Sequence, residues 1–263
     1  MIEQVQQKVR ELLEAGTIQG FLGLREQYGH IAPHLFQDPN DLEGMSLGDR
    51  ERPGDARYPL SKLLLTLARN YPQATLGILV RGCDERALES LAAWNQLDRD
   101  KVVPVGITCP RELAEECECE RPYAKDPVAG EKTEPVAFAS VARLQELEPS
   151  ERMRYWLREF DKCVKCYGCR DVCPVCFCRE CSLEDQHLVR TRNLPPENPI
   201  FHLTRATHMA GRCIDCGLCE QACPAQIPLR RLYKKVGQIM EEEFSYHTGE
   251  TKQKPPLQIA DEQ

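Results

Sequence analysis

The stretch Cys163-Val-Lys-Cys166-Tyr-Gly-Cys169-Arg-Asp-Val-Cys173-Pro174 recurs in form as Cys213-Ile-Asp-Cys216-Gly-Leu-Cys219-Glu-Gln-Ala-Cys223-Pro224. Both follow C-x2-C-x2-C-x3-C-P, a spacing at which cysteine thiolates hold a [4Fe–4S] cluster. The proline after the fourth cysteine has a fixed φ and no N–H, so it turns the chain away from the cluster. Two copies of this run predict two [4Fe–4S] clusters.

In two-cluster ferredoxins the fourth cysteine of each run ligates the other cluster. The two expected ligand sets are therefore Cys163, Cys166, Cys169 and Cys223, and Cys213, Cys216, Cys219 and Cys173. Between Cys173 and Cys213 lie 39 residues, more than a minimal two-cluster ferredoxin needs. This insertion carries Cys176, Cys178 and Cys181, which either take a fourth ligand from the Cys117–Cys119 loop or bind nothing.

Zinc and disulfides are the alternatives for so many cysteines. Zinc sites use separated C-x2-C pairs or Cys/His mixtures rather than two runs of four. The start Met1-Ile2-Glu3-Gln4-Val5 lacks the basic and apolar regions of a secretory signal, which predicts a cytoplasmic location. In that reducing compartment, the 15 cysteines are expected to hold metal rather than disulfides.

Charge and hydropathy exclude two classes of partner. The formal charge is −7 over 263 residues and the Lys and Arg residues are scattered, so nucleic acid is not expected as a partner. The apolar runs Leu63–Leu65 and Leu76–Val80 are too short to span a membrane.

The first half contains a strand–helix–strand pattern. Thr75–Val80 and Lys101–Ile107 read as buried strands and Asp84–Leu97 as the helix between them, which predicts parallel pairing. Four cysteines are expected at the carboxyl edge of that sheet or in the next loop, where open α/β sheets bind ligands: Cys83, Cys109, Cys117 and Cys119. They predict either a possible third cluster or a set of small buried residues without metal.

Hydrophobic periodicity predicts further helices over Glu3–Glu14, Leu60–Asn70, Glu151–Asp161 and Leu229–Phe244. Ser150 is expected to cap the third of these, and Asn198 to cap another helix that has Pro199 at its first position. One or two short strands are expected within residues 18–36, a loop over 38–55 and a short strand near Val136–Ala139.

The fold class is therefore α+β, with two domains. Residues 1–121 form an α/β domain with a short parallel sheet and residues 122–149 a linker. Residues 150–248 form an elaborated bacterial two-[4Fe–4S] ferredoxin-like domain and residues 249–263 a tail. His202 and His208 lie six residues apart and share no helix face, so they are expected to pack or hydrogen-bond near the second cluster rather than ligate it.

Two parts of the chain resemble known protein families. The second half resembles dicluster ferredoxin-type subunits of anaerobic oxidoreductases, through Cys163–Cys181, Phe201–Cys213 and Ala222–Leu229. The first half looks like the beta subunit of deazaflavin-reducing hydrogenases and related formate dehydrogenases. That likeness rests on Tyr58-Pro-Leu, Arg81-Gly-Cys-Asp-Glu-Arg-Ala87 and Gly106-Ile-Thr-Cys109.

The resemblance implies a non-catalytic subunit that relays electrons within a redox complex. Its partners would be a formate dehydrogenase or hydrogenase and a heterodisulfide-reductase-like flavoprotein. The alternative is a flavin-containing oxidoreductase acting on a deazaflavin or nicotinamide cofactor, but no flavin-binding segment follows Cys223, so FAD is not the expected cofactor. A redox or iron sensor is a third class, and no basic patch or helix-turn-helix pattern indicates it.

Overall fold

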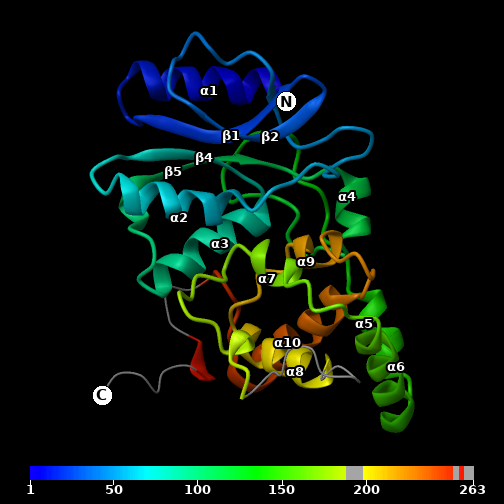
Figure 1. Cartoon of the computed structure of the whole chain (residues 1–263). Helices are drawn as coiled ribbons and strands as arrows, with labels where there is room; N and C mark the ends of the chain where they lie inside the picture. The colour runs from blue at the N-terminus through cyan, green and yellow to red at the C-terminus, as the bar shows by residue number, and fades with distance from the viewer. Residues whose placement is uncertain (188–197, 251–254, 258–263) are drawn as a thin grey trace. The chain divides into compact units, whose positions relative to one another are not determined.

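The computed structural model describes residues 1–187, 198–250 and 255–257, and contacts between residues divide the chain into two units (Figure 1). Unit 1 comprises Met1–Ala137 and Gly249–Lys252, and unit 2 comprises Phe138–Thr248 and Gln253–Gln263. The sequence also predicts a loop over Pro195–Asn198; all of it except Asn198, and most of the expected tail, lie outside the described residues. Gly249 and Glu250 belong to unit 1, where Glu250 pairs with Arg121 at 2.8 Å.

Unit 1 is built on a mixed sheet, which in the described residues has the order β2-β1-β4-β5-β6, with β3 on β1. The strands are β1 (Gly20–Gln27), β2 (His30–Phe36), β3 (Met45–Ser46), β4 (Leu76–Val80), β5 (Val102–Ile107) and β6 (Pro127–Ala129). β4 runs parallel to β5, as the strand–helix–strand pattern predicts, and it also runs parallel to β1. Every residue of β4 is buried. β2 and β3 pair antiparallel with β1.

Helices cover both faces of this sheet (Figure 1). α1 (Ile2–Glu14) lies on one side and buries Val5 and Val9 completely. α2 (Leu60–Asn70) and α3 (Gly82–Ala93) lie on the other side and pack on β4. The short helices η1 (Arg99–Lys101) and α4 (Arg111–Glu116) flank β5. The result is a three-layer arrangement in which the carboxyl ends of β4 and β5 lie at one edge.

Three local expectations for this unit were wrong. α3 begins at Gly82 instead of Asp84, because the Asp84 carboxylate accepts from the Arg81 N–H and caps the helix two residues earlier. The expected loop over 38–55 includes β3. The strand expected near Val136–Ala139 lies instead at Pro127–Ala129, where it pairs with the open edge of β5.

The described elements of unit 2 are helical: α5 (Ala139–Gln145), α6 (Pro149–Asp161), α7 (Gly168–Asp171), η2 (Ser182–Glu184), α8 (Asn198–Met209), α9 (Leu218–Gln221) and α10 (Leu229–Phe244). The residue that caps α6 is Glu148, not Ser150, because Glu148 and Glu151 form a reciprocal capping box. Pro149 then occupies the first helical position, where its missing N–H costs nothing. α6 and α10 deliver the chain to and from the two cysteine loops.

Candidate iron–sulfur centres

The two cysteine runs fold into loops with the same backbone conformation. Lys165 and Asp215, which precede the second cysteine of each run, have φ of 50° and 56°. Tyr167 and Gly217, just after that cysteine, have φ of 60° and 76°. Two left-handed residues so close together bend the chain tightly, which brings the first three cysteines of each run to one side of the loop.

The same hydrogen bonds then form in both loops. α7 and α9 are single turns that begin directly after the left-handed Tyr167 and Gly217. The N–H of Cys173 donates to Arg170 O at 3.2 Å, and the N–H of Cys223 donates to Glu220 O at 3.1 Å. The sequence repeat is therefore a structural repeat, and in each copy the turn carries the fourth cysteine away from the first three.

One pocket of unit 2 gathers cysteines from both runs. Its lining includes Cys163, Cys166 and Cys169 from the first loop and Cys223 from the second. Phe201, Ile227 and Leu229 supply apolar walls. Burial raises the pKa of the Cys163 thiol, and the neighbouring Cys166 and Cys223 raise it further. Four thiol sulfurs in an apolar pocket are the donors that a [4Fe–4S] cluster takes.

The remaining four cysteines of the runs also interact with one another. Burial, with Asp215 and Cys216 nearby, raises the pKa of Cys213 to about 12. Burial raises the pKa of Cys219, to which Cys216 and Cys213 add. The hydrogen bond with the Cys176 side chain raises the pKa of Cys173, and burial and the charge of the nearby Cys216 raise it further. A coordinating thiol is deprotonated, so these thiols would lose their protons on binding iron.

No disulfide joins any of the 15 cysteines, all of which lie in the described residues. In the described part of the chain, no group of three or more His, Cys, Asp and Glu side chains is arranged to hold a metal ion. A cube differs from a single ion because each thiolate binds a separate iron atom. The four thiols around the first pocket fit that requirement.

Arg205 lies buried between the two sets, with 3% of its surface exposed. Its Nη2 donates to Cys169 O at 2.8 Å, and its Nη1 donates to Cys176 Sγ at 3.3 Å. Burial lowers the pKa of this guanidinium, but Tyr233 and the thiols of Cys173, Cys176 and Cys169 outweigh that effect and raise it. Sequence reasoning missed this residue. The sequence feature that could have identified Arg205 is a single cationic residue on the buried face of an apolar helix.

His202 lines the pocket of the first set. Its ring stacks on Phe160, with centroids 4.5 Å apart and planes at 14°. Within the described residues neither ring nitrogen has a hydrogen-bond partner. Burial, and then the charge of Arg205, lower the pKa of His202 to about 4. The ring is therefore a neutral packing group, while His208 is exposed.

A charged clamp holds the second loop against α10. Arg230 donates from Nε and Nη2 to the Asp215 carboxylate at 2.7 and 3.1 Å, and Lys234 Nζ lies 2.9 Å from Asp215 Oδ2. Lys234 is 5% exposed and lies 3.5 Å from the centre of the Phe138 ring. The clamp fixes Asp215 in its left-handed conformation.

The three cysteines of the insertion occupy different places. Cys176 contacts Cys173 and Arg205. Cys178 is exposed and lies 4.0 Å from Arg212 Nη1, and Cys181 interacts with Arg170. The fourth ligand proposed for them from the Cys117–Cys119 loop stays a prediction.

The side chain of Asn198, the expected helix cap, instead donates from Nδ2 to Cys163 O at 2.9 Å. It thereby ties the start of α8 to the first cysteine loop.

Comparison with known proteins agrees with this geometry. Residues 162–228 match the 4Fe-4S dicluster domain. The chain is 40% identical over 114 residues to the F420-dependent formate dehydrogenase subunit beta of Methanocaldococcus jannaschii, covering 43% of this chain and 30% of that protein. It is 44% identical over 113 residues to the F420-dependent formate dehydrogenase 1 subunit beta of Methanococcus maripaludis, covering 43% and 28%.

The two resemblances expected from the sequence, to a dicluster domain and to formate dehydrogenase beta subunits, are thus confirmed. The chain spans less than a third of the length of these two relatives. Both four-cysteine loops lie inside the matched dicluster segment. No helix in the described residues is both long enough and apolar enough to cross a membrane.

Proposed function

We propose that this chain is an iron–sulfur electron-transfer subunit of an oxidoreductase complex. One cube binds Cys163, Cys166, Cys169 and Cys223, and the other binds Cys213, Cys216, Cys219 and Cys173. The observation that carries this proposal is the entry of Cys223, 54 residues after Cys169 in the sequence, into the pocket of the first three cysteines. Exchange of fourth ligands is the arrangement of two-cluster ferredoxins.

Exchanged ligands keep the two cubes close together. Cys169 belongs to the first set and interacts with Cys219 of the second. Arg205 adds a cation next to ligands of both sets, and a positive charge stabilises the more negative, reduced state of a cluster. Two adjacent cubes with a shared cation suit one-electron transfer through the domain.

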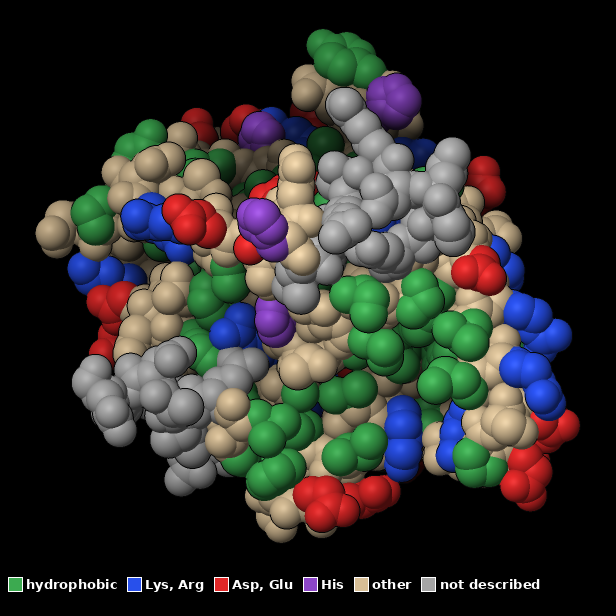
Figure 2. Space-filling view, turned by 60° about the horizontal axis from the view of Figure 1, so that its bottom comes forward, with side chains coloured by type: hydrophobic (Ala, Val, Ile, Leu, Met, Phe, Trp, Pro, Cys, Tyr) green, Lys and Arg blue, Asp and Glu red, His purple; other side chains and the backbone are tan. Residues whose placement is uncertain are grey.

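The first set lies near the surface, where a partner can exchange electrons with it. Cys166 is exposed, and Val164 beside it has 70% of its surface exposed. Apolar side chains are also exposed on the adjoining helices, namely Met153 and Leu157 on α6 and Ile200 and Leu203 on α8. Figure 2 shows hydrophobic side chains gathered on one face of the molecule with charged groups at their borders. Such a surface suits docking to a protein.

The proposed complex contains a formate dehydrogenase or hydrogenase as electron donor and a heterodisulfide-reductase-like flavoprotein as acceptor. The names of the two relatives, both formate dehydrogenase beta subunits, support the first partner. Those names also favour a second candidate, an oxidoreductase that itself reacts with F420. It would require a flavin or substrate site in addition to the clusters.

Purification from native cells under anaerobic conditions tests the proposal. The isolated chain should contain at least about eight iron and eight sulfide, accept electrons from dithionite and show no turnover with formate, hydrogen, F420 or nicotinamide cofactors. The donor and acceptor proteins should co-purify with it. Four or fewer irons, or stoichiometric zinc, would contradict the two cubes. Turnover by the single chain, with flavin absorbance, would replace the relay by the second candidate.

A further inference from the structure

We propose that the Tyr233 hydroxyl donates a hydrogen bond to a sulfur atom of the second cube and thereby raises the reduction potential of that cluster. This role of Tyr233 rests on the proposed function, because it requires the cube that is proposed for Cys213, Cys216, Cys219 and Cys173. Its basis is a buried hydroxyl that has no acceptor among the described residues and lies near ligands of both sets.

Tyr233 lies where α10 meets the two other helices of the dicluster site. Its side chain is 3% exposed. α10 packs against α8, which carries Arg205, and against α9, which carries Cys219. The guanidinium carbon of Arg205 lies 5.8 Å from the centre of the Tyr233 ring, and Arg205 Nη2 donates to Cys169 O at 2.8 Å. Arg205 thus links the ring to the first cysteine loop.

The phenol interacts with thiols of both ligand sets. Burial raises the pKa of Tyr233 well above its usual value, and Arg205 opposes that effect. Cys219, Cys169 and Cys213 raise the pKa further, and Cys219 has the largest effect of the three. Two of these thiols, Cys219 and Cys213, belong to the second set. Tyr233 is therefore a neutral phenol that keeps its O–H, and the second cube is the acceptor that these interactions favour.

The Tyr233 hydroxyl has no hydrogen-bond partner in the described part of the chain. Arg205 does not supply one, because its guanidinium lies over the face of the ring. The Nε of Arg205 is itself buried and unpaired among the same residues. Leaving a buried donor unpaired destabilises a protein, so buried polar groups rarely lack a partner. Two such donors next to ligands of both sets indicate an acceptor that the clusters would supply.

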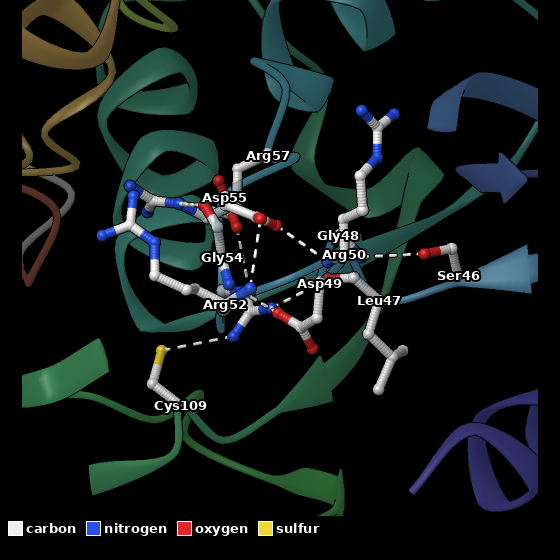
Figure 3. Close-up of polar contacts among 12 residues, drawn as sticks. Ser46, Leu47, Gly48, Asp49, Arg50, Arg52, Gly54, Asp55, Arg57 and Cys109 are labelled. Carbon is white, nitrogen blue, oxygen red and sulfur yellow. Dashed lines mark hydrogen bonds and ion pairs between the residues drawn. The ribbon is translucent and has the colours of Figure 1, made fainter. Parts of the chain in front are cut away.

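A buried guanidinium in unit 1 provides the contrast. Arg81 is 4% exposed. Its Nη1 donates to Cys109 Sγ at 3.7 Å, and its Nη2 donates to Leu47 O and to the Asp49 carboxylate at 2.8 and 3.1 Å (Figure 3). Protein groups therefore supply acceptors to both terminal nitrogens of Arg81. Around the Tyr233 hydroxyl the described residues supply none.

A phenol is suited to this role. The sulfur atoms of a cluster accept hydrogen bonds, and these bonds help to set its reduction potential. Reduction adds one negative charge to the cluster, so a hydrogen-bond donor stabilises the reduced state more than the oxidised state. The proton stays on the Tyr233 oxygen throughout, and no covalent bond forms or breaks. Removing this hydroxyl should therefore make the second cube harder to reduce.

The test is Tyr233→Phe in the full chain after anaerobic reconstitution with iron and sulfide. This variant removes one oxygen atom and keeps the aromatic ring. Like the natural chain, it should hold about eight iron. At a fixed potential, the ratio of reduced to oxidised second cube should fall roughly fivefold, and the first cube should shift less. Potentiometric titration followed by electron paramagnetic resonance measures both, and Cys219→Ser identifies the second cube by altering its signal.

Pulsed electron paramagnetic resonance supplies a readout that a packing role would not change. After exchange into D₂O, the reduced second cube of the natural chain should show a deuterium coupling that Tyr233→Phe lacks. Tyr246→Phe is the matched control. Tyr246 lies in the same unit, is 7% exposed, packs with Ala210 and Met240, and has its pKa raised by burial alone. This control should leave the potentials and the deuterium coupling unchanged.

Unchanged potentials and an unchanged deuterium coupling in a Tyr233→Phe protein with full iron would overturn the proposal for Tyr233 and leave the two cubes in place. A buried water would then be the partner of the hydroxyl. Loss of iron from this variant would also overturn the proposal, because the hydroxyl would be needed for structure. An equal shift of the potentials in Tyr246→Phe would do the same. A natural chain with about four or fewer iron would instead contradict the proposed function, and the role of Tyr233 with it.

Discussion

At the scale of single residues, Arg205 has the widest influence on the dicluster domain. Its guanidinium donates to the backbone of Cys169, in one proposed ligand set, and to the thiol of Cys176, which interacts with Cys173 of the other proposed set. Since the side chain is 3% exposed, water screens its charge only weakly. We therefore expect this buried residue to affect both the packing and the electron affinity of the proposed clusters.

We expect Arg205→Gln to lower the reduction potentials of the clusters by on the order of 50–100 mV. A full charge at this range stabilises an added electron by about 1–2 kcal/mol. Potentiometric titration followed by electron paramagnetic resonance measures the shift. Arg205→Lys keeps the positive charge and should shift the reduction potentials much less. Arg158→Gln, at an exposed position, serves as the control. If the variant holds its full iron content and its reduction potentials are unchanged, Arg205 has only a packing role.

His202 offers a second test at this scale, because its ring packs without hydrogen bonds in the described structure. We expect His202→Phe to change the free energy of unfolding by less than about 1.5 kcal/mol, since it conserves an aromatic volume. His202→Ala should cost about 3 kcal/mol through a cavity beside Phe160. Denaturant unfolding with parallel iron analysis distinguishes the two. Loss of iron in a folded His202→Phe protein would indicate a ligand instead.

At the scale of elements, the two cysteine loops differ in how they are supported. The first loop is tied to α8 by Asn198 and to η2 by the Tyr167 hydroxyl, which donates to Leu183 O at 2.9 Å. The second is clamped to α10 by Arg230 and Lys234 through Asp215. Each four-residue turn is too short to be stable as an isolated helix. Neighbouring helices therefore hold the loops in shape.

We expect Asp215→Ala to destabilise unit 2 by roughly 2–3 kcal/mol, because it leaves the buried Lys234 ammonium without its carboxylate. Cluster loss on exposure to chelator should accelerate as well. Glu242→Ala on the same helix removes an exposed pair with Lys235 and should cost less than about 0.5 kcal/mol. Thermal unfolding and the rate of bleaching of cluster absorbance provide the readouts. Equal effects in both variants would show that the Asp215 clamp does not stabilise unit 2.

At the scale of the whole molecule, we expect the two units to depend on metal to different degrees. Unit 1 has a continuous apolar core in which Phe21, Ile78, Val80 and Ile107 are completely buried or nearly so. In unit 2 the eight dicluster cysteines belong to short loops, whose helical turns α7 and α9 have four residues each. Metal binding is therefore expected to supply part of the folding free energy of unit 2.

Anaerobic removal of iron with a chelator should separate the two units in hydrogen exchange. Amides of β4 and β5 should keep their protection, while those of α7 and α9 should exchange on the order of 100-fold faster. Mass spectrometry of peptides from Leu76–Val80 and from Leu218–Gln221 measures the difference. Chelator already saturated with ferrous iron is the control. Simultaneous loss of protection in both peptides would show one cooperative unit.

Several features of this protein follow from its sequence alone, because they depend on residues close together in the chain. The left-handed positions inside each cysteine run, and hence the loops, are local. So are α1, α2 and α10, whose apolar residues recur at helical spacing. The parallel pairing of β4 and β5 follows from one strand–helix–strand unit. The place of Cys223 in the pocket of Cys163, Cys166 and Cys169 agrees with what the C-x3-C-P spacing predicts.

Other features were decided only when distant segments packed together. The strand at Pro127–Ala129 formed because the backbone N–H and C=O groups at the edge of β5 needed hydrogen-bond partners. A local sequence pattern does not show that need. The burial of Arg205 and the place of His202 at the first set depend on how α8 lies against α6 and the loops. Several local conformations of these segments have nearly equal free energy. Contacts between residues far apart in the sequence decide which of them forms.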